Sequence, residues 1–282
     1  MQNSQIGFIG GGNMARSLVG GLLKNGWTAA NLTISEPDDF NASLLRKLDP
    51  ALKLTRDNRL VAENADVVLF AIKPQIFAEV VEPLRETLQR QRPLLISIAA
   101  GVTINSIDRW SGGGLPIVRC MPNTPALVES GATGLFANAA VDDGQRAIAE
   151  SLLRAVGLAV WLDEESLIDT VTALSGSGPA YFFLLMEALQ DAASAQGLPA
   201  DTAKLLALQT AFGAAKLALE SDTDFATLRQ RVTSRGGTTE AALNVFEQQG
   251  LRDTVTAAVE AAANRSRELA ELFAGDNHSE SS

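Results

Sequence analysis

The chain has 282 residues, of which 46% are hydrophobic, and this is enough apolar sequence for the cores of two ordinary domains. Its 33 acidic and 23 basic residues give a formal net charge of −10, which argues against binding to nucleic acid or to an anionic membrane. The apolar run at residues 93–102 is far shorter than the roughly 20 residues of a membrane-spanning helix. We expect no signal peptide, because no basic segment precedes the first apolar run.

Short apolar, β-branched runs alternate with helical patterns through the first half of the chain. These runs lie at residues 5–9, 32–34, 66–72, 94–98 and 115–120. Continuous apolar runs separated by helices are typical of strands covered on both faces, so they predict a doubly wound, parallel α/β sheet. Two further runs, at residues 132–136 and 159–162, flank a helical stretch at 142–156 and are expected to extend the sheet.

The strand pattern ends near residue 165, and the rest of the chain is alanine-rich and helical. Apolar residues share one helical face at Leu205, Leu208, Phe212, Ala215 and Leu219. We therefore predict a Rossmann-type dinucleotide-binding domain at 1–164, an all-helical domain at 165–274 and a disordered polar tail at 275–282. The alanine-rich faces of residues 241–263 suit either an oligomer interface or an intrachain core.

A glycine-rich motif of the form G-x-G-x-x-A follows the first predicted strand and opens the first predicted helix. It consists of Gly10, Gly11, Gly12, Asn13, Met14 and Ala15. Such glycines let the backbone approach a pyrophosphate, and the helix N-terminus supplies N–H donors. An ordinary strand-to-helix turn is the alternative, but the position in the first βαβ unit favours dinucleotide binding.

The end of the second predicted strand bears on the choice of cofactor. Glu36 stands where an acidic side chain accepts a hydrogen bond from a free ribose 2′-hydroxyl and repels a 2′-phosphate, which favours NADH. Two alternatives stay open. Glu36 can simply cap the turn at Pro37, and Ser35 can donate a hydrogen bond to a phosphate oxygen.

Proline-containing segments end two further predicted strands, at residues 71–75 and 121–125. Doubly wound sheets bind ligands at the carboxyl ends of their strands, so both segments are candidates for ligand contact. Proline at a strand end is also common as plain turn chemistry, and neither segment decides the matter alone.

A third candidate segment, residues 232–239, lies between two helical segments and reads Val-Thr-Ser-Arg-Gly-Gly-Thr-Thr. Paired glycines before hydroxyl residues at a helix start predict a concave row of backbone N–H groups that suits a carboxylate. Thr239 adds a hydroxyl donor. The alternative is a helix stop followed by the N-cap of the next helix.

The residues available for catalysis limit the mechanism. The one histidine, His278, lies in the predicted tail, and no Cys, His and Asp cluster has the spacing of a metal site. The one cysteine, Cys120, stands in an apolar run and is expected to be a buried thiol in a reducing cytoplasm. Hydride transfer to a protonated imine needs neither a histidine base nor a metal.

Taken together, these motifs resemble the pyrroline-5-carboxylate reductase family over residues 6–273. The segments that carry the resemblance are the glycine motif and residues 71–75, 119–125, 173–181 and 234–239. Three features differ from the family pattern. The His-Pro pair that is often found upstream of residues 234–239 is absent from residues 221–225. Arg235 stands where proline is frequent, and Glu36 stands where a small hydroxyl residue is frequent in a family that commonly prefers NADPH.

The resemblance implies hydride transfer from NADPH or NADH to the cyclic imine 1-pyrroline-5-carboxylate, giving proline. It also implies a helical dimerisation domain, a homodimer and a ring of dimers. The implied cofactor residues are Ile9, Gly10, Gly11, Gly12, Asn13, Met14, Ser35, Glu36, Asn58, Ala71, Ile72, Lys73 and Pro74. The implied substrate residues are Asp222, Ser234, Gly236, Gly237, Thr238 and Thr239, with Thr239 as the catalytic residue near the ring nitrogen.

Two other functions are alternatives to this hypothesis. A β-hydroxyacid dehydrogenase shares a Rossmann plus all-helical plan but relies on a lysine in the helical domain, for which Lys204 and Lys216 are the candidates. Both lie on an amphipathic helix where a solvated face explains them equally well. A non-catalytic nucleotide-binding protein would keep the fold without turnover.

Overall fold

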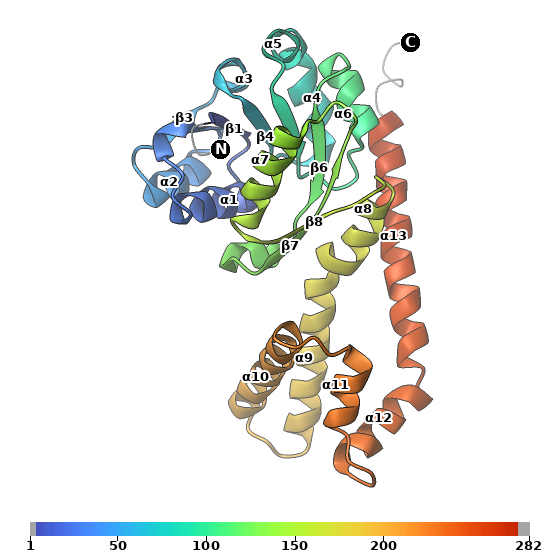
Figure 1. The fold of residues 1–282 in the computed structure, drawn as a ribbon. Helices are drawn as coiled ribbons and strands as arrows, with labels where there is room; N and C mark the ends of the chain where they lie inside the picture. The colour runs from blue at the N-terminus through green and yellow to red at the C-terminus, as the bar shows by residue number, and fades with distance from the viewer. Residues whose placement is uncertain (1–3, 276–282) are drawn as a thin grey trace, which may run out of the picture. The chain divides into compact units, whose positions relative to one another are not determined.

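A computed structural model describes residues 4–275 (Figure 1). The chain forms two compact units, one combining Met1–Ser177 with Ala261–Ser282 and the other comprising Gly178–Glu260. This division differs from the predicted domains, which meet at residue 165. Of the predicted tail, residues 276–282 lie outside the described residues, and Gly275 ends the last helix.

The first unit contains an eight-stranded sheet in the order β3-β2-β1-β4-β5-β6-β7-β8. The strands are β1 (Ile6–Ile9), β2 (Leu32–Ser35), β3 (Lys53–Thr55), β4 (Val67–Phe70), β5 (Leu94–Ser97), β6 (Ile117–Met121), β7 (Gly131–Ala137) and β8 (Gly157–Trp161). All neighbours pair in parallel except β6 and β7, which are antiparallel. The first six strands follow the order of doubly wound, dinucleotide-binding sheets, which confirms the predicted fold class.

Helices connect these strands and cover both faces of the sheet (Figure 1). They are α1 (Asn13–Lys24), α2 (Asp39–Leu48), α3 (Asn58–Asn64), α4 (Phe77–Val81), α5 (Arg85–Gln91), α6 (Ile104–Ser111), α7 (Asp143–Arg154) and α8 (Leu167–Val171). The start of α7 shows the local cause of one boundary. The Asp142 side chain accepts a hydrogen bond from the Gln145 N–H, and the Gln145 side chain accepts one from the Asp142 N–H. Two N–H groups at the start of the helix, which have no partner within it, are thereby satisfied.

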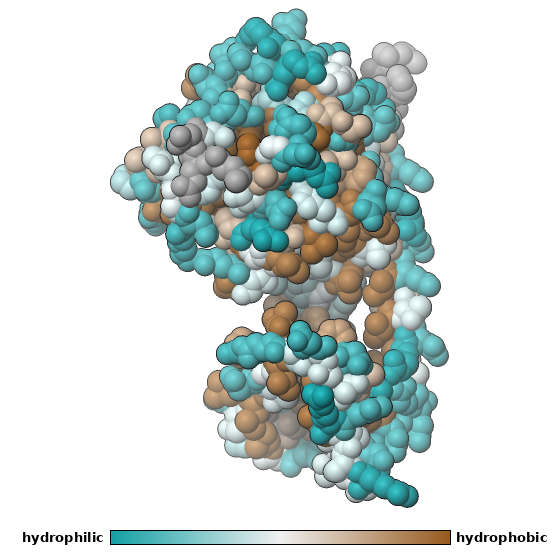
Figure 2. All heavy atoms as spheres, in the orientation of Figure 1, coloured by the Kyte–Doolittle hydropathy of each residue, from teal (hydrophilic) through white to brown (hydrophobic). Residues whose placement is uncertain are grey.

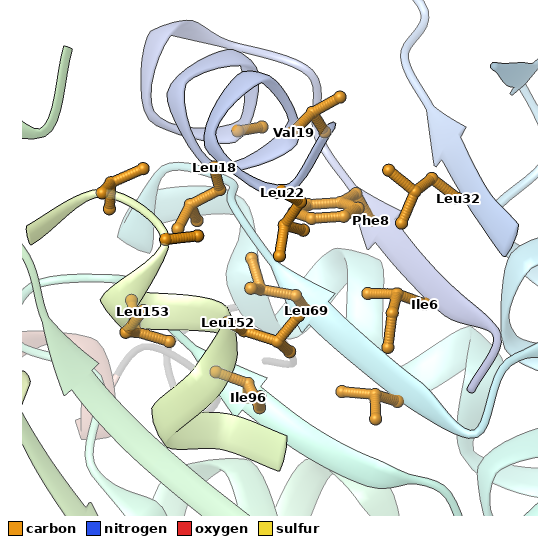
Figure 3. Packing of buried hydrophobic residues seen from close by; sticks show 14 of the residues in the cluster. Ile6, Phe8, Leu18, Val19, Leu22, Leu32, Leu69, Ile96, Leu152 and Leu153 are labelled. Carbon is orange, nitrogen blue, oxygen red and sulfur yellow. The ribbon is translucent and has the colours of Figure 1, made fainter. Parts of the chain in front are cut away.

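Each face of the sheet has its own hydrophobic core. On one face, Phe8 and Leu69 pack with α1 and α7, and Figure 3 shows Leu22 of α1 beside Phe8. On the other face, Val68 and Phe70 pack with residues of α3 to α6. Neighbouring residues of β4 therefore serve opposite cores, which is why the strands read as continuous apolar runs.

Cys120 lies in the first of these cores and is 1% exposed, which confirms the predicted buried thiol. Burial raises the pKa of this thiol far above its usual value, so the reactive thiolate is suppressed. We expect the native chain to react with a thiol reagent at least about 100-fold more slowly than the urea-unfolded chain, because the sulfur must first be exposed. Equal rates in a disulfide-exchange assay would contradict this burial.

A buried ionic network also belongs to the first unit. The Arg119 side chain, 3% exposed, pairs with Glu165 at 2.9 Å and with Asp169 at 3.7 Å. Glu165 also accepts a hydrogen bond from the Ile104 N–H at the start of α6, at 2.8 Å. Asp169 accepts one from the Ser266 hydroxyl at 2.7 Å. Because Ser266 lies in α13 (Leu251–Gly275), the network ties the end of this helix to β6 and α8.

Four helices and the start of α13 form the second unit. The four are α9 (Gly178–Ala195), α10 (Ala200–Leu219), α11 (Phe225–Arg231) and α12 (Thr238–Gln248). Large apolar side chains stay exposed on it, including Phe182 at 65%, Phe212 at 59% and Leu219 at 87%, and Figure 2 shows hydrophobic residues gathered on this part of the surface. Exposed apolar area of this extent marks an interaction surface. Across residues 4–275, no helix is both long and apolar enough to cross a membrane.

Candidate functional site

The glycine motif lies where the carboxyl ends of β1, β2 and β4 meet. Gly10 follows β1 with a φ of +98°, a conformation that favours glycine. Its N–H donates to the Ser35 carbonyl oxygen at 2.9 Å. A Cβ on Gly10 would stand 2.5 Å from the carbonyl oxygen of Ala71, and the Ala71 N–H in turn donates to the Ile9 carbonyl at 2.8 Å. A glycine is therefore required at position 10 for the backbone to pack at the carboxyl ends of β1, β2 and β4.

Gly12 differs from Gly10 because nothing lies within 4 Å of the place where its Cβ would stand. It is the N-cap residue of α1 and has an extended backbone, with φ −65°. The N–H groups in the first turn of a helix lack partners within the helix, so those of α1 are available to an anion. The open space beside Gly12 and these donors fit a pyrophosphate group.

We expect alanine substitution at Gly10 to affect thermal stability and alanine substitution at Gly12 to affect cofactor binding. Gly10→Ala should lower the midpoint of thermal unfolding by several degrees, because of the positive φ and the contact with Ala71. Gly12→Ala should leave this midpoint unchanged but weaken cofactor binding about tenfold or more, because its methyl group enters the open space. Thermal unfolding and cofactor titration of both variants check this, and equal midpoints for the two variants would contradict it.

Glu36 is held against the glycine motif by two hydrogen bonds. Its Oε2 accepts from the Gly11 N–H at 2.7 Å, and its Oε1 accepts from the Asp38 N–H at 2.8 Å. The side chain is 8% exposed. The Ser35 hydroxyl is buried and has no hydrogen-bond partner among the described residues. Glu36 thus faces the motif, whereas Ser35 offers no accessible hydroxyl in this structure.

The remaining predicted cofactor residues follow the neighbouring strands. Asn58 is half-buried and opens α3, shortly after β3. Ala71 and Ile72 follow β4 and lie beside Gly10. Lys73 is exposed and precedes a 3₁₀ turn, Pro74–Ile76, in which the Ile76 N–H donates to the Lys73 carbonyl.

The structure brings together two other segments that the sequence singles out. Asn123, just after β6, donates from its amide to the Ser175 carbonyl at 3.1 Å and accepts from the Ala132 N–H at 2.8 Å. Ser175 belongs to a π-helical turn, Thr172–Gly176, and a Cβ on Gly176 would stand 2.7 Å from the Met121 methyl. π-Turns of this kind are frequent at functional sites. Residues 121–125 therefore have a structural role as the support of this turn.

The predicted substrate loop joins α11 to α12 in the second unit. Gly236 has a φ of +73°, and Gly237 is the N-cap residue of α12. The Gly237 N–H donates to the Ser234 carbonyl at 3.0 Å, and the Gly236 N–H donates to the Glu240 carboxylate at 2.7 Å. Two of the expected donors are therefore used inside the loop.

The N–H groups of Thr238 and Thr239, in the first turn of α12, are the donors available to a carboxylate. Thr239 is half-buried. Glu240 was not predicted as part of the loop, although an acidic residue three positions after an N-cap is a known helix-start signal. Asp222 is exposed and lies before the N-cap of α11, so this helix of seven residues, about 10 Å long, stands between Asp222 and the loop in the sequence.

Comparisons with known proteins agree with both halves of this arrangement. Residues 165–269 match the family model described as pyrroline-5-carboxylate reductase dimerisation, and residues 5–101 match the model described as NADP oxidoreductase coenzyme F420-dependent. A pyrroline-5-carboxylate reductase of Pseudomonas aeruginosa is 48% identical over 272 residues, which are 96% of this chain and 98% of that protein.

Solved structures of the same enzyme are also similar. The pyrroline-5-carboxylate reductase of Coxiella burnetii has a TM-score of 0.90 and 49% identity, covering 94% of this chain and 98% of that one. The Plasmodium falciparum pyrroline carboxylate reductase, solved with NADP bound, has a TM-score of 0.84 and 31% identity, covering 96% of this chain and 99% of that one. The chain therefore belongs to the pyrroline-5-carboxylate reductase family.

Proposed function

We propose that this chain reduces 1-pyrroline-5-carboxylate to proline with hydride from a reduced nicotinamide dinucleotide. The observation that carries the proposal is the full-length similarity to pyrroline-5-carboxylate reductases, at 48% identity. The glycine motif at the end of β1 and the Gly-Gly-Thr-Thr loop before α12 supply a dinucleotide cradle and a carboxylate-binding helix start.

The reaction needs little acid–base help from the protein. When bound, the reduced nicotinamide supplies a hydride, and the electron pair of this hydride forms the new C–H bond at the imine carbon. The π electrons of the C=N bond become the lone pair of the ring nitrogen, which keeps the proton that activated the imine. The side chains therefore have to position the imine, donate hydrogen bonds to it and exclude water.

We assign the binding roles as the sequence predicts them. Thr239 is the catalytic residue, with its hydroxyl placed to donate to the lone pair that forms on the ring nitrogen as the hydride is transferred, and Asp222 lines the substrate site. The carboxylate lies on the loop formed by Ser234, Gly236, Gly237, Thr238 and Thr239, where the N–H groups of Thr238 and Thr239 are the donors and the other three residues shape the loop. The cofactor is bound by Ile9, Gly10, Gly11, Gly12, Asn13, Met14, Ser35, Glu36, Asn58, Ala71, Ile72, Lys73 and Pro74. Ser35 contributes through its backbone, because its hydroxyl is buried.

The assembly follows from the helical part of the chain. The match of residues 165–269 to a dimerisation model supports a homo-oligomer. We propose a homodimer with interleaved helices, and a ring of such dimers, in which residues 165–274 act as one dimerisation domain. The exposed Phe182, Phe212 and Leu219 support this arrangement, because association would cover them. We also propose a cytoplasmic location, since the one cysteine is a free, buried thiol.

Absorbance of the reduced nicotinamide, followed with the purified full-length chain, tests the proposal. The imine should cause a decay with NADH or NADPH, and a β-hydroxyacid offered with the oxidised cofactors should cause no rise. The lysines that a hydroxyacid dehydrogenase would need are exposed here, and Lys216 pairs with Glu220 at 3.7 Å. A rise with the hydroxyacid and no decay with the imine would overturn the proposal.

A further inference from the structure

We infer that Glu36 makes this chain select NADH over NADPH, by accepting the ribose hydroxyls and excluding a 2′-phosphate. The inference rests on the proposed function in one respect, namely that the chain binds a nicotinamide dinucleotide at the glycine motif. It concerns the choice between two cofactors and is independent of which substrate receives the hydride.

The position of the Glu36 carboxylate is fixed by the backbone. Oε2 accepts from Gly11, in the glycine motif, and Oε1 accepts from Asp38, in the turn that follows β2. The Glu36 N–H donates to the Thr55 carbonyl of β3 at 2.9 Å, which fixes the main chain as well. A side chain held at both oxygens and 8% exposed cannot turn away without losing both hydrogen bonds.

Each carboxylate oxygen still has a second lone pair after accepting one backbone N–H. A ribose with free hydroxyls offers donors to these lone pairs, as acidic residues at this position do in dinucleotide-binding sheets. A 2′-phosphate offers only acceptor oxygens and negative charge at pH 7. In a partly buried corner the resulting repulsion is weakly screened, so the carboxylate discriminates strongly against it.

The residues next to Glu36 in the chain offer no free donor to a phosphate. The Ser35 hydroxyl is buried, Pro37 has no N–H, and the Asp38 N–H is already bonded to Glu36. Arg56, which directly follows β3, is a nearby cation, but its guanidinium donates to the carboxylate of Asp39. This hydrogen bond lowers the pKa of Asp39, so the acid is ionised and holds the arginine at neutral pH.

Cofactor binding by the purified full-length chain tests the inference without turnover. Dissociation constants for NADH and NADPH are measured by nicotinamide fluorescence in the absence of the imine, and kcat/KM for the imine is measured with each cofactor. The native chain should bind NADH at least about tenfold more tightly than NADPH. Glu36→Ser should tighten NADPH binding and weaken NADH binding, so that their ratio changes by about 100-fold or more.

Two further variants distinguish the effect of charge on cofactor selectivity from a loss of structural support for the glycine motif. Asp39→Asn, at an exposed position, should release Arg56 and tighten NADPH binding severalfold without weakening NADH binding. Glu63→Gln removes the same charge from the exposed surface of α3, where Glu63 pairs with Arg90 at 3.3 Å, and should leave the ratio unchanged. If Glu36→Ser only removed structural support from the glycine motif, the binding of both cofactors would weaken. Tighter NADPH binding by this variant would instead show that a repulsion has been removed.

The inference fails if the native chain binds NADPH as tightly as NADH, or if Glu36→Ser weakens both cofactors equally. Should Glu36→Ser not fold, the native ratio and the Asp39→Asn variant still decide the question. Imine reduction that proceeds equally well with both cofactors would contradict this inference and leave the proposed function standing. Tighter binding of NADH than of NADPH without any imine reduction would overturn the proposed function and leave this inference standing.

Discussion

Thr239→Ala is expected to lower the turnover number for the imine by about 10- to 100-fold and to leave cofactor affinity within about twofold. The hydrogen bond from Thr239 forms as the lone pair develops on the ring nitrogen in the transition state, and a loss of about 1.4–2.8 kcal/mol there corresponds to this change in rate. Thr239 lies in the first turn of α12, apart in the sequence from every residue of the glycine motif. Stopped-flow or steady-state kinetics, together with a fluorescence titration of the cofactor, give the two quantities.

Two variants control this measurement. Thr239→Ser keeps the hydroxyl and should retain most of the turnover. Thr254→Ala removes an exposed hydroxyl that donates to the Gly250 carbonyl and should change neither quantity. If Thr239→Ala instead abolishes cofactor binding, or leaves turnover unchanged, the assignment of this loop to the substrate is wrong.

Arg119→Leu is expected to reduce the free energy of unfolding by about 3 kcal/mol, because it leaves the buried Asp169 and the half-buried Glu165 without their cation. Glu165 and Asp169 would keep hydrogen bonds from the Ile104 N–H and the Ser266 hydroxyl, but neither partner carries a charge. Urea unfolding followed by circular dichroism measures the change. The chain concentration has to be held constant, since an oligomer's stability depends on it.

The matched control is a surface ion pair of similar length. Arg154 pairs with Glu150 at 2.9 Å on α7, and its side chain is 61% exposed. Arg154→Leu should change the free energy of unfolding by less than about 1 kcal/mol. A loss below about 1 kcal/mol for Arg119→Leu as well would show that the buried network contributes little to stability.

The order of elements in the first unit was predictable because the local signals agree. The apolar runs at residues 5–9, 66–72 and 94–98 contain strands β1, β4 and β5, and the predicted helix at 142–156 contains α7. Strand β3 was missed because three residues, Lys53–Thr55, carry too little apolar pattern at the sheet edge. The antiparallel direction of β7 was not predictable either, since an apolar run gives no direction.

Long-range contacts account for the other differences. Arg119 reads as part of a strand, and its partner Glu165 is 46 positions away. The contact between Ser266 and Asp169 spans 97 positions. Together these contacts place the end of α13 in the first unit, which a boundary near residue 165 does not anticipate. A helical period identifies α13 but does not identify what it packs against.

The candidate site was predictable where the backbone conformation demands a particular residue. Gly10 and Gly236 have positive φ angles, which fits the roles that the sequence assigns to both glycine motifs. The sequence left the role of Ser35 open, because solvent exposure at a strand end depends on how neighbouring strands pack. The sequence also does not show whether the Gly236 N–H is available to a ligand. In the fold this N–H donates to the Glu240 carboxylate.

The most direct test of the central claim follows the hydride itself. The full-length chain is given the imine and reduced cofactor that carries deuterium at the transferred position of nicotinamide C4. The proposed function predicts one proline per cofactor oxidised, with deuterium at proline C5, the former imine carbon. Cofactor oxidation without labelled proline, or proline labelled elsewhere, would contradict it.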